Sequence, residues 1–118
     1  MSGKNKNIEI GKKGEDMAAE YLAGHGYEIL ERNYRAGRVE IDIIARHGKI
    51  MVFVEVKTRT SEGFGYPEES VDETKQDCIQ TCAEEYMVQT GWEGEIRFDI
   101  IAVNLKQLPD IRHFKDAF

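Results

Sequence analysis

The sequence predicts an α/β protein with a mixed central sheet flanked by helices, in the element order α-β-β-β-α-β. Two segments have apolar residues at helical spacing, one ending near residue 23 and one covering about residues 70–89. The strands at residues 39–57 are rich in β-branched residues and apolar on both faces near their middle, as expected for strands covered on both sides. A further core-type strand covers residues 95–105.

The chain of 118 residues is long enough for one domain with a hydrophobic core. We expect residues 1–10 to form a flexible N-terminal tail and residues 11–118 to form a single domain. The apolar runs are too short to span a bilayer, and the first lysines are not followed by the apolar stretch of a secretory signal. We therefore expect a cytoplasmic protein in which both cysteines, Cys78 and Cys82, are buried thiols on one helix face.

The formal net charge of −6 argues against a protein that coats nucleic acid without specificity. The charge is unevenly distributed, however. Residues 1–60 contain 11 Lys/Arg and 9 Asp/Glu, whereas residues 61–118 contain 5 and 13. Any nucleic-acid-binding face is therefore local, and we expect it to use the N-terminal half of the chain.

Residues 39–57 have the pattern of a hairpin, and a glycine at the first central position of its Gly-Lys turn favours type II′ geometry. The register set by this turn places Asp42 opposite Glu55 and Glu40 opposite Lys57, on one face of the sheet. Opposed carboxylates repel each other unless a positive charge lies between them. A divalent ion that takes oxygen ligands, Mg²⁺ or Mn²⁺, would supply that charge. A register slip of one residue would instead put the two acids on opposite faces.

The first helix begins between residues 10 and 13, and its apolar stripe contains Ala18, Tyr21 and Leu22. Glu15 falls on the same stripe, where a carboxylate needs a partner. Two interpretations remain open. Glu15 is either a glutamate of the first turn favoured by the helix dipole, or a fourth acid directed toward the hairpin.

Two connections between these elements carry residues suited to contacts with nucleic acid. A strand at residues 27–34 is followed by a turn that carries Arg35 and Arg38, which either stay solvated or contact phosphate. The loop at residues 59–67 contains glycines and two aromatic residues, which either pack on the domain or stack on a base.

Ser70 and Glu73 form a capping box that predicts the start of the second helix, and Gly91 predicts its end. Lys75 lies on the inward stripe of this helix. It is either a lysine whose stem packs on the core while its ammonium reaches water, or a cation directed at a substrate phosphate. Residues 111–114, beyond Pro109, fit a short edge strand.

The residues that match a known family run from about residue 11 to residue 118. They are Gly14-Glu15 with Ala18 and Ala19, Tyr21-Leu22, Gly26-Tyr27, Arg32-Asn33-Tyr34-Arg35, Glu40-Ile41-Asp42, Phe53-Val54-Glu55-Val56-Lys57, Arg59, Lys75 and Arg97-Phe98-Asp99. With this set the chain resembles the YraN-like uncharacterised bacterial proteins. Those proteins are similar to the archaeal Holliday-junction resolvases and to the restriction-endonuclease-like superfamily.

The resemblance implies a restriction-endonuclease-like sandwich and a Mg²⁺- or Mn²⁺-dependent endonuclease that hydrolyses phosphodiesters with a metal-activated water. Its implied metal ligands are Asp42, Glu55 and the carbonyl of Val56. The implied catalytic residues are these two acids, Glu15 and Lys57. Glu40 would tune the site and pair with Lys57.

The same resemblance implies branched or processed DNA as the substrate and a homodimer as the assembly. The residues expected to contact phosphate are Arg35, Arg38, Arg59 and Lys75. Two other functions remain open at this point. The chain could be a nucleic-acid-binding module with a vestigial site, or a scaffold protein whose acids form a structural ion network.

Overall fold

The structure is a computed structural model that describes residues 3–60, 71–106 and 108–118. Its elements are α1 (Gly3–Gly24), β1 (Glu28–Ala36), β2 (Val39–His47), β3 (Ile50–Arg59), α2 (Glu73–Thr90), β4 (Glu95–Asn104) and β5 (Asp110–Phe114). In the described part of the chain the strands form one sheet in the order β1-β2-β3-β4-β5. Strands β3 and β4 are parallel and the other neighbours are antiparallel, so the predicted mixed sheet is confirmed.

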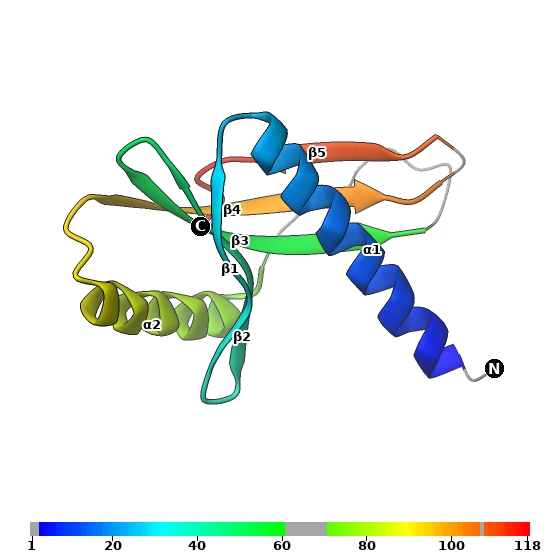
Figure 1. The fold of residues 1–118 in the computed structure, drawn as a ribbon. Helices are drawn as coiled ribbons and strands as arrows, with labels where there is room; N and C mark the ends of the chain where they lie inside the picture. Colours follow the sequence, from blue (N-terminus) through cyan, green and yellow to red (C-terminus); the bar gives the residue numbers. More distant parts are fainter. Residues whose placement is uncertain (1–2, 61–70, 107) are drawn as a thin grey trace.

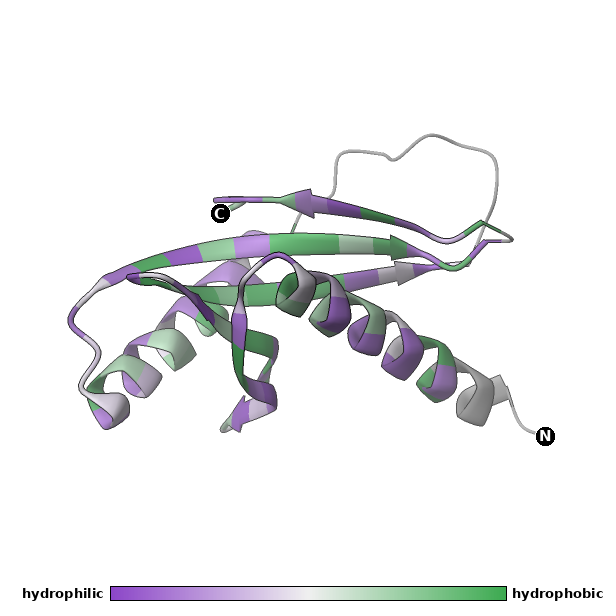
Figure 2. Ribbon diagram, turned by 45° about the horizontal axis from the view of Figure 1, so that its top comes forward, coloured by the Kyte–Doolittle hydropathy of each residue, from purple (hydrophilic) through white to green (hydrophobic). Residues whose placement is uncertain are grey.

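The two helices cover opposite faces of the sheet (Figure 1). On one face Leu22 of α1 packs with Val54 of β3, and on the other Ile79 of α2 packs with Phe53. Successive residues of β3 therefore face different helices, which explains why this strand is apolar on both faces. Figure 2 shows the long hydrophobic stretches of β3 and β4.

The β2–β3 hairpin has the predicted register, with Ile43 paired to Val54 and His47 paired to Ile50. Gly48 has a φ of 62°, as the first central residue of a type II′ turn requires. Counted from the turn, pairing ends at Ile43, and the N-terminal part of β2, residues 39–42, separates from β3. The β1–β2 hairpin then runs at a steep angle to β3 and β4 (Figure 1).

Several predicted boundaries are wrong. Helix α1 begins at Gly3, so residues 3–10, which we predicted as a tail, are helical. These residues contain little apolar periodicity to detect, yet extending an existing helix is inexpensive compared with nucleating one. Strand β1 continues through Arg35 and Ala36, which we predicted as part of a turn.

Helix α2 starts two residues later than predicted because Asp72 is its N-cap and accepts a hydrogen bond from the Lys75 N–H at 2.9 Å. Its predicted end at Gly91 is confirmed by a left-handed cap. Of the two cysteines only Cys82 is buried, whereas Cys78 is exposed, so the prediction of two buried thiols is wrong. Ser70 and the aromatic residues of the loop at 59–67 lie outside the described residues.

Strand β5 is the predicted edge strand. None of the described helices is long and apolar enough to cross a membrane.

Candidate functional site

Four carboxylates from three elements meet where β2 leaves β3. Glu15 comes from α1, Glu40 and Asp42 from β2, and Glu55 from β3. Oxygens of Glu15, Glu40 and Asp42 lie within 4.8 Å of one another. We call the four residues the acid site. Glu15 is thus directed toward the hairpin, the second of the two interpretations that its position left open.

Glycine beside Glu15 allows α1 to reach this position. A Cβ atom at Gly14 would collide with the side chain of Thr58 on β3, so only glycine fits at this close approach. The contact brings the first half of α1 against the strand that carries Glu55. Helix packing at Gly14 therefore sets the distance between Glu15 and the acids of the hairpin.

Asn33 of β1 links two of the acids, although we had not assigned it to the site. Its side-chain amide donates to Oε1 of Glu15 at 2.8 Å and to Oε1 of Glu40 at 2.7 Å. Its backbone is left-handed, with a φ of 52°, a conformation that Asn adopts more easily than most residues. An Asn within an otherwise regular strand pattern is the sequence signal that could have identified it.

Asp42 is the acid whose protonation is most perturbed. Its Oδ2 accepts a hydrogen bond of 2.7 Å from the backbone N–H of Val56, which replaces strand pairing at this point. Burial, and after it the nearby carboxylate of Glu55, raise the pKa of Asp42 from 3.8 to about 8, although the hydrogen bond from the Val56 N–H acts to lower it. Without a metal ion, the site therefore tends to retain a proton on Asp42.

Glu55 has a cation partner that we had assigned to a different role. Its side chain is 8% exposed, and its Oε2 lies 2.9 Å from the ammonium nitrogen of Lys75 on α2. Burial lowers the pKa of Lys75, but the hydrogen bond to Glu55 and the charges of Glu55 and Asp42 outweigh it, so the net shift is upward. Lys75 is thus the cation that the structure places in the acid site.

The predicted ion pair between Glu40 and Lys57 is wrong. Glu40 instead accepts hydrogen bonds from Asn33 and from Arg35, whose Nη2 lies 3.3 Å from Oε2. The reason is the divergence of β2 from β3, which carries Glu40 away from the strand that it would otherwise face. Lys57 is partly exposed, and its side chain makes no hydrogen bond or ion pair with the described residues.

A cavity of about 380 Å³ opens onto the acid site. Its lining residues are Arg38, Val39, Glu40, Asp42, Glu55, Lys75 and Cys78. Arg38 is exposed in the β1–β2 turn, and Arg59 is exposed at the end of β3. Of the four residues expected to contact phosphate, Arg38 and Lys75 therefore line the cavity, while Arg35 pairs with Glu40.

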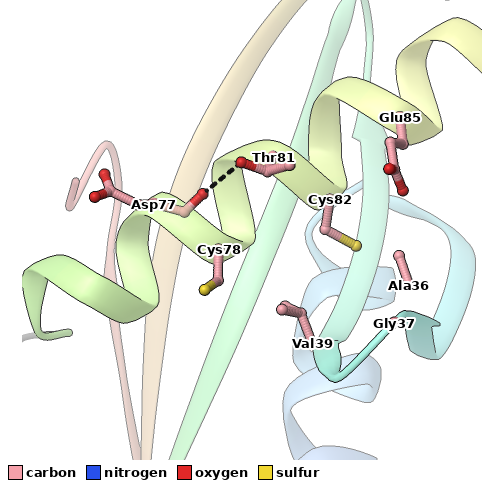
Figure 3. A pocket seen from close by; sticks show the side chains of 8 residues that line it. All are labelled: Ala36, Gly37, Val39, Asp77, Cys78, Thr81, Cys82 and Glu85. Atoms are coloured by element: carbon pink, nitrogen blue, oxygen red, sulfur yellow. Dashed lines mark hydrogen bonds between the residues drawn. The ribbon is translucent and has the colours of Figure 1, made fainter.

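A second cavity, of about 320 Å³, lies between α2 and the β1–β2 turn. Figure 3 shows Cys78 and Cys82 on the side of α2 that faces Val39 and the turn. This groove shares Val39 and Cys78 with the cavity of the acid site, so the two lie next to each other. Its walls are mainly apolar, and acidic residues of α2 stand at its rim.

The acid site fits a small divalent ion by its ligand type and its dimensions. Opposite oxygens around an octahedral Mg²⁺ are about 4.2 Å apart. The 4.8 Å limit on the oxygens of Glu15, Glu40 and Asp42 is therefore within a small side-chain adjustment of that geometry. Carboxylates are also the ligands that Mg²⁺ and Mn²⁺ prefer.

The fold and the site define a mixed α/β domain, compatible with a nuclease-like sandwich, that carries an acidic cluster at the point where its hairpin leaves the sheet. The chain belongs to UPF0102, an uncharacterised protein family, whose match covers residues 14–103. That range includes all four acids and Lys75.

Relatives in several bacteria match nearly the full length of the chain. A UPF0102 protein of Thermodesulfovibrio yellowstonii is 47% identical over 111 residues, which cover 94% of this chain and 96% of the relative. A UPF0102 protein of Geobacter metallireducens is 46% identical, with 95% of this chain and 93% of the relative covered. One of Chlorobium chlorochromatii is 43% identical, with 100% and 97% covered. These names give a family and no activity.

Proposed function

We propose that the protein is a metal-dependent endonuclease that cuts branched or processed DNA by hydrolysis with a metal-activated water. The observation that carries this proposal is the convergence of Glu15, Glu40 and Asp42 within 4.8 Å, beside the buried Glu55 and at the wall of an open cavity. Like charges held this close are unfavourable unless a cation binds among them. A site with that property is suited to a divalent ion.

The proposed ligands of Mg²⁺ or Mn²⁺ are Asp42, Glu55 and the carbonyl of Val56, assisted by Glu15. Glu40 joins them in the proposal because its carboxylate lies within the same cluster. When bound, the ion would act as a Lewis acid on the scissile phosphate and lower the pKa of the attacking water.

The lysines and arginines around the cavity have complementary tasks in this proposal. Lys57 follows Glu55 by two residues on β3 and has no partner among the described residues, so its ammonium is available to orient water or stabilise charge on phosphorus. Arg38 and Lys75 line the cavity and would bind the phosphates beside the cut. Arg35 and Arg59 would bind further phosphates along the DNA strand.

The substrate and assembly follow from the resemblance to resolvases. A four-way junction presents two equivalent strands, and a two-fold homodimer presents two equivalent sites to cut them. We place the protein in the cytoplasm, where bacterial DNA is found. The exposed acids of α2 beyond Lys75, among them Glu84 and Glu85, repel phosphate, so DNA would approach the cavity from the side of the β1–β2 hairpin, where Arg35 and Arg38 lie.

One observation favours a second candidate, a nucleic-acid-binding module without catalysis. The ion pair between Lys75 and Glu55 already neutralises one acid of the site without a metal. In this alternative the acids support the fold, and the cations alone bind DNA.

Cleavage of labelled four-way, flap, single-stranded and linear duplex DNA with Mg²⁺ or Mn²⁺ tests the proposal. Asp42→Asn and Glu55→Gln are compared with Glu84→Gln, which removes an exposed acid of α2 away from the site. We expect wild type and Glu84→Gln to cut and both site variants to be inactive. If the wild type binds DNA but neither cuts nor binds metal, the module is correct. Equal cutting by all variants would indicate a contaminating nuclease.

A further inference from the structure

We propose that Lys75 is an internal competitor of the metal: its ammonium occupies Glu55 in the metal-free protein and is displaced when a divalent ion binds. This inference rests on the proposed function only in assuming that the acid site takes a metal. It adds a coupling between metal entry and the release of a phosphate-binding cation.

The first step is the environment of Glu55. Its side chain is 8% exposed, and a carboxylate so buried is costly without a counter-charge. Within the described residues, the one ion pair of Glu55 is the contact of 2.9 Å with Lys75. In the metal-free protein, Lys75 therefore supplies the positive charge that Glu55 requires.

The second step is that Lys75 and a metal ion exclude each other on Glu55. A divalent ion bound by the same carboxylate would lie a few ångströms from the ammonium, and the two positive charges would repel strongly in this partly buried setting. Lys75 must therefore move away when the ion enters. By the same argument, removing Lys75 must strengthen metal binding.

The third step is that the side chain of Lys75 can move while its backbone stays in place. The backbone N–H is held by the N-cap Asp72 at 2.9 Å, which anchors the first turn of α2. The side chain is 44% exposed and ends in a flexible four-carbon arm. Once displaced, its ammonium remains at the cavity that it shares with Arg38. Metal binding would thus release a cation where a substrate phosphate arrives.

The alternative is a purely structural lysine that supports Glu55 whether or not metal is bound. The two possibilities predict opposite signs for one measurement. A structural lysine positions a ligand, so its loss weakens metal binding. A competitor blocks a ligand, so its loss tightens metal binding.

Titration of the metal-free protein with Mn²⁺, followed by calorimetry and by the electron paramagnetic resonance of free Mn²⁺, tests the sign. The variants are Lys75→Gln, Lys75→Arg and Lys49→Gln, of which the last removes an equal charge from the exposed β2–β3 turn. We expect Lys75→Gln to bind Mn²⁺ about tenfold more tightly than wild type. We expect Lys75→Arg and Lys49→Gln to stay within about twofold of wild type.

A second measurement on the wild type removes any dependence on how well the variant folds. Brief acetylation of the protein, with and without Mn²⁺, is mapped by mass spectrometry, and Lys49 serves as the internal reference. We expect Mn²⁺ to increase modification of Lys75 severalfold, because the ammonium leaves its ion pair.

The outcomes separate this inference from the proposed function. If wild type binds Mn²⁺ but Lys75→Gln binds it no more tightly, or Mn²⁺ leaves acetylation of Lys75 unchanged, the competitor is wrong and the metal site stands. If no folded variant binds Mn²⁺, both the competitor and the proposed metal site are wrong.

Discussion

Two aspartates of this protein, the buried Asp99 and the half-buried Asp42, have opposite electrostatic environments. Asp99 of β4 is fully buried and accepts two hydrogen bonds of 2.8 Å from Arg97, one of 2.6 Å from Nε2 of His113 and one of 3.0 Å from the Asp116 N–H. Burial alone would raise its pKa, but these donors outweigh it and lower the pKa. Asp42 faces other carboxylates, and its pKa is raised.

The difference shows at which of the two aspartates the negative charge is balanced by neighbouring groups of the protein. Arg97 also donates to the hydroxyl of Tyr27 at 2.8 Å, so the network around Asp99 joins β4, β5 and the connection between α1 and β1, and it pairs the carboxylate with the guanidinium of Arg97. Such a network supports the fold. Around Asp42, by contrast, four carboxylates lie together, and only two cations, Lys75 and Arg35, form ion pairs with them among the described residues. Burial is therefore less informative about function than whether the buried charge is balanced.

The largest expected effect on stability comes from breaking the network around Asp99. Asp99→Asn would leave Arg97 without its counter-charge and would remove the carboxylate that His113 contacts, and we expect it to lower the free energy of unfolding by about 3–5 kcal/mol. Urea unfolding measures this, with Asp77→Asn on the surface of α2 as the control. A loss as small as that of the control would mean that Asp99 is not the centre of the network.

The pH dependence of stability distinguishes the two aspartates by sign. The folded-state pKa of Asp42 is raised from 3.8 to about 8, so the folded protein binds this proton more tightly than the unfolded chain. Stability from this group is complete below pH 4 and is lost as the pH rises toward 8. The full change in pKa corresponds to about 6 kcal/mol, and we expect roughly half of it, about 3 kcal/mol, because the half-buried carboxylate is screened by solvent. Asp99, whose pKa is lowered, acts oppositely and loses stability only as the pH falls.

Urea midpoints of the metal-free protein at about pH 5 and pH 8.5 test this prediction. Asp42→Asn lacks the titrating group, so the loss of stability with rising pH should disappear in that variant. The same slope in both proteins would show that another group titrates in this range.

Local patterns predicted the parts of the site that depend on one hairpin. The turn at Gly48 fixed the register, and the register brought Asp42 beside Glu55. The ion pair between Glu40 and Lys57 failed because the same register was extended past the point where the strands separate. Strand divergence depends on how β1 and β2 twist over α2, and alternation along a strand contains no signal for it.

Contacts between elements distant in the chain could not be predicted from the sequence, for a related reason. Lys75 could be placed on the inward stripe of α2, but its partner depends on where that helix crosses the sheet. The donors to Asp99 come from three positions along β4, β5 and the C-terminal segment. A pattern identifies which residues point inward, whereas only the packed structure determines which charges meet.

A bound metal ion should balance the negative charge of the acid site, as Arg97 balances the charge of Asp99, and should therefore stabilise the folded protein. With Mn²⁺ at 100 times its dissociation constant, we expect the wild type to gain about 2.7 kcal/mol over the protein in EDTA. Urea unfolding with and without Mn²⁺ measures the gain, and Glu84→Gln should show the same gain as wild type. We expect no gain in Asp42→Asn. A gain in that variant equal to wild type would place the ion elsewhere.

The smallest effect concerns Asn33, which holds two acids of the site together. Ala at this position is strained by the left-handed backbone and Gly is not, so we expect Asn33→Ala to be less stable than Asn33→Gly by about 1 kcal/mol. Both variants lose the hydrogen bonds to Glu15 and Glu40 and should bind Mn²⁺ several times more weakly. Unfolding curves and Mn²⁺ titrations separate these effects. The two variants differ in backbone strain, whereas both lack the side-chain amide. Wild-type affinity in both would limit Asn33 to shaping the backbone of β1.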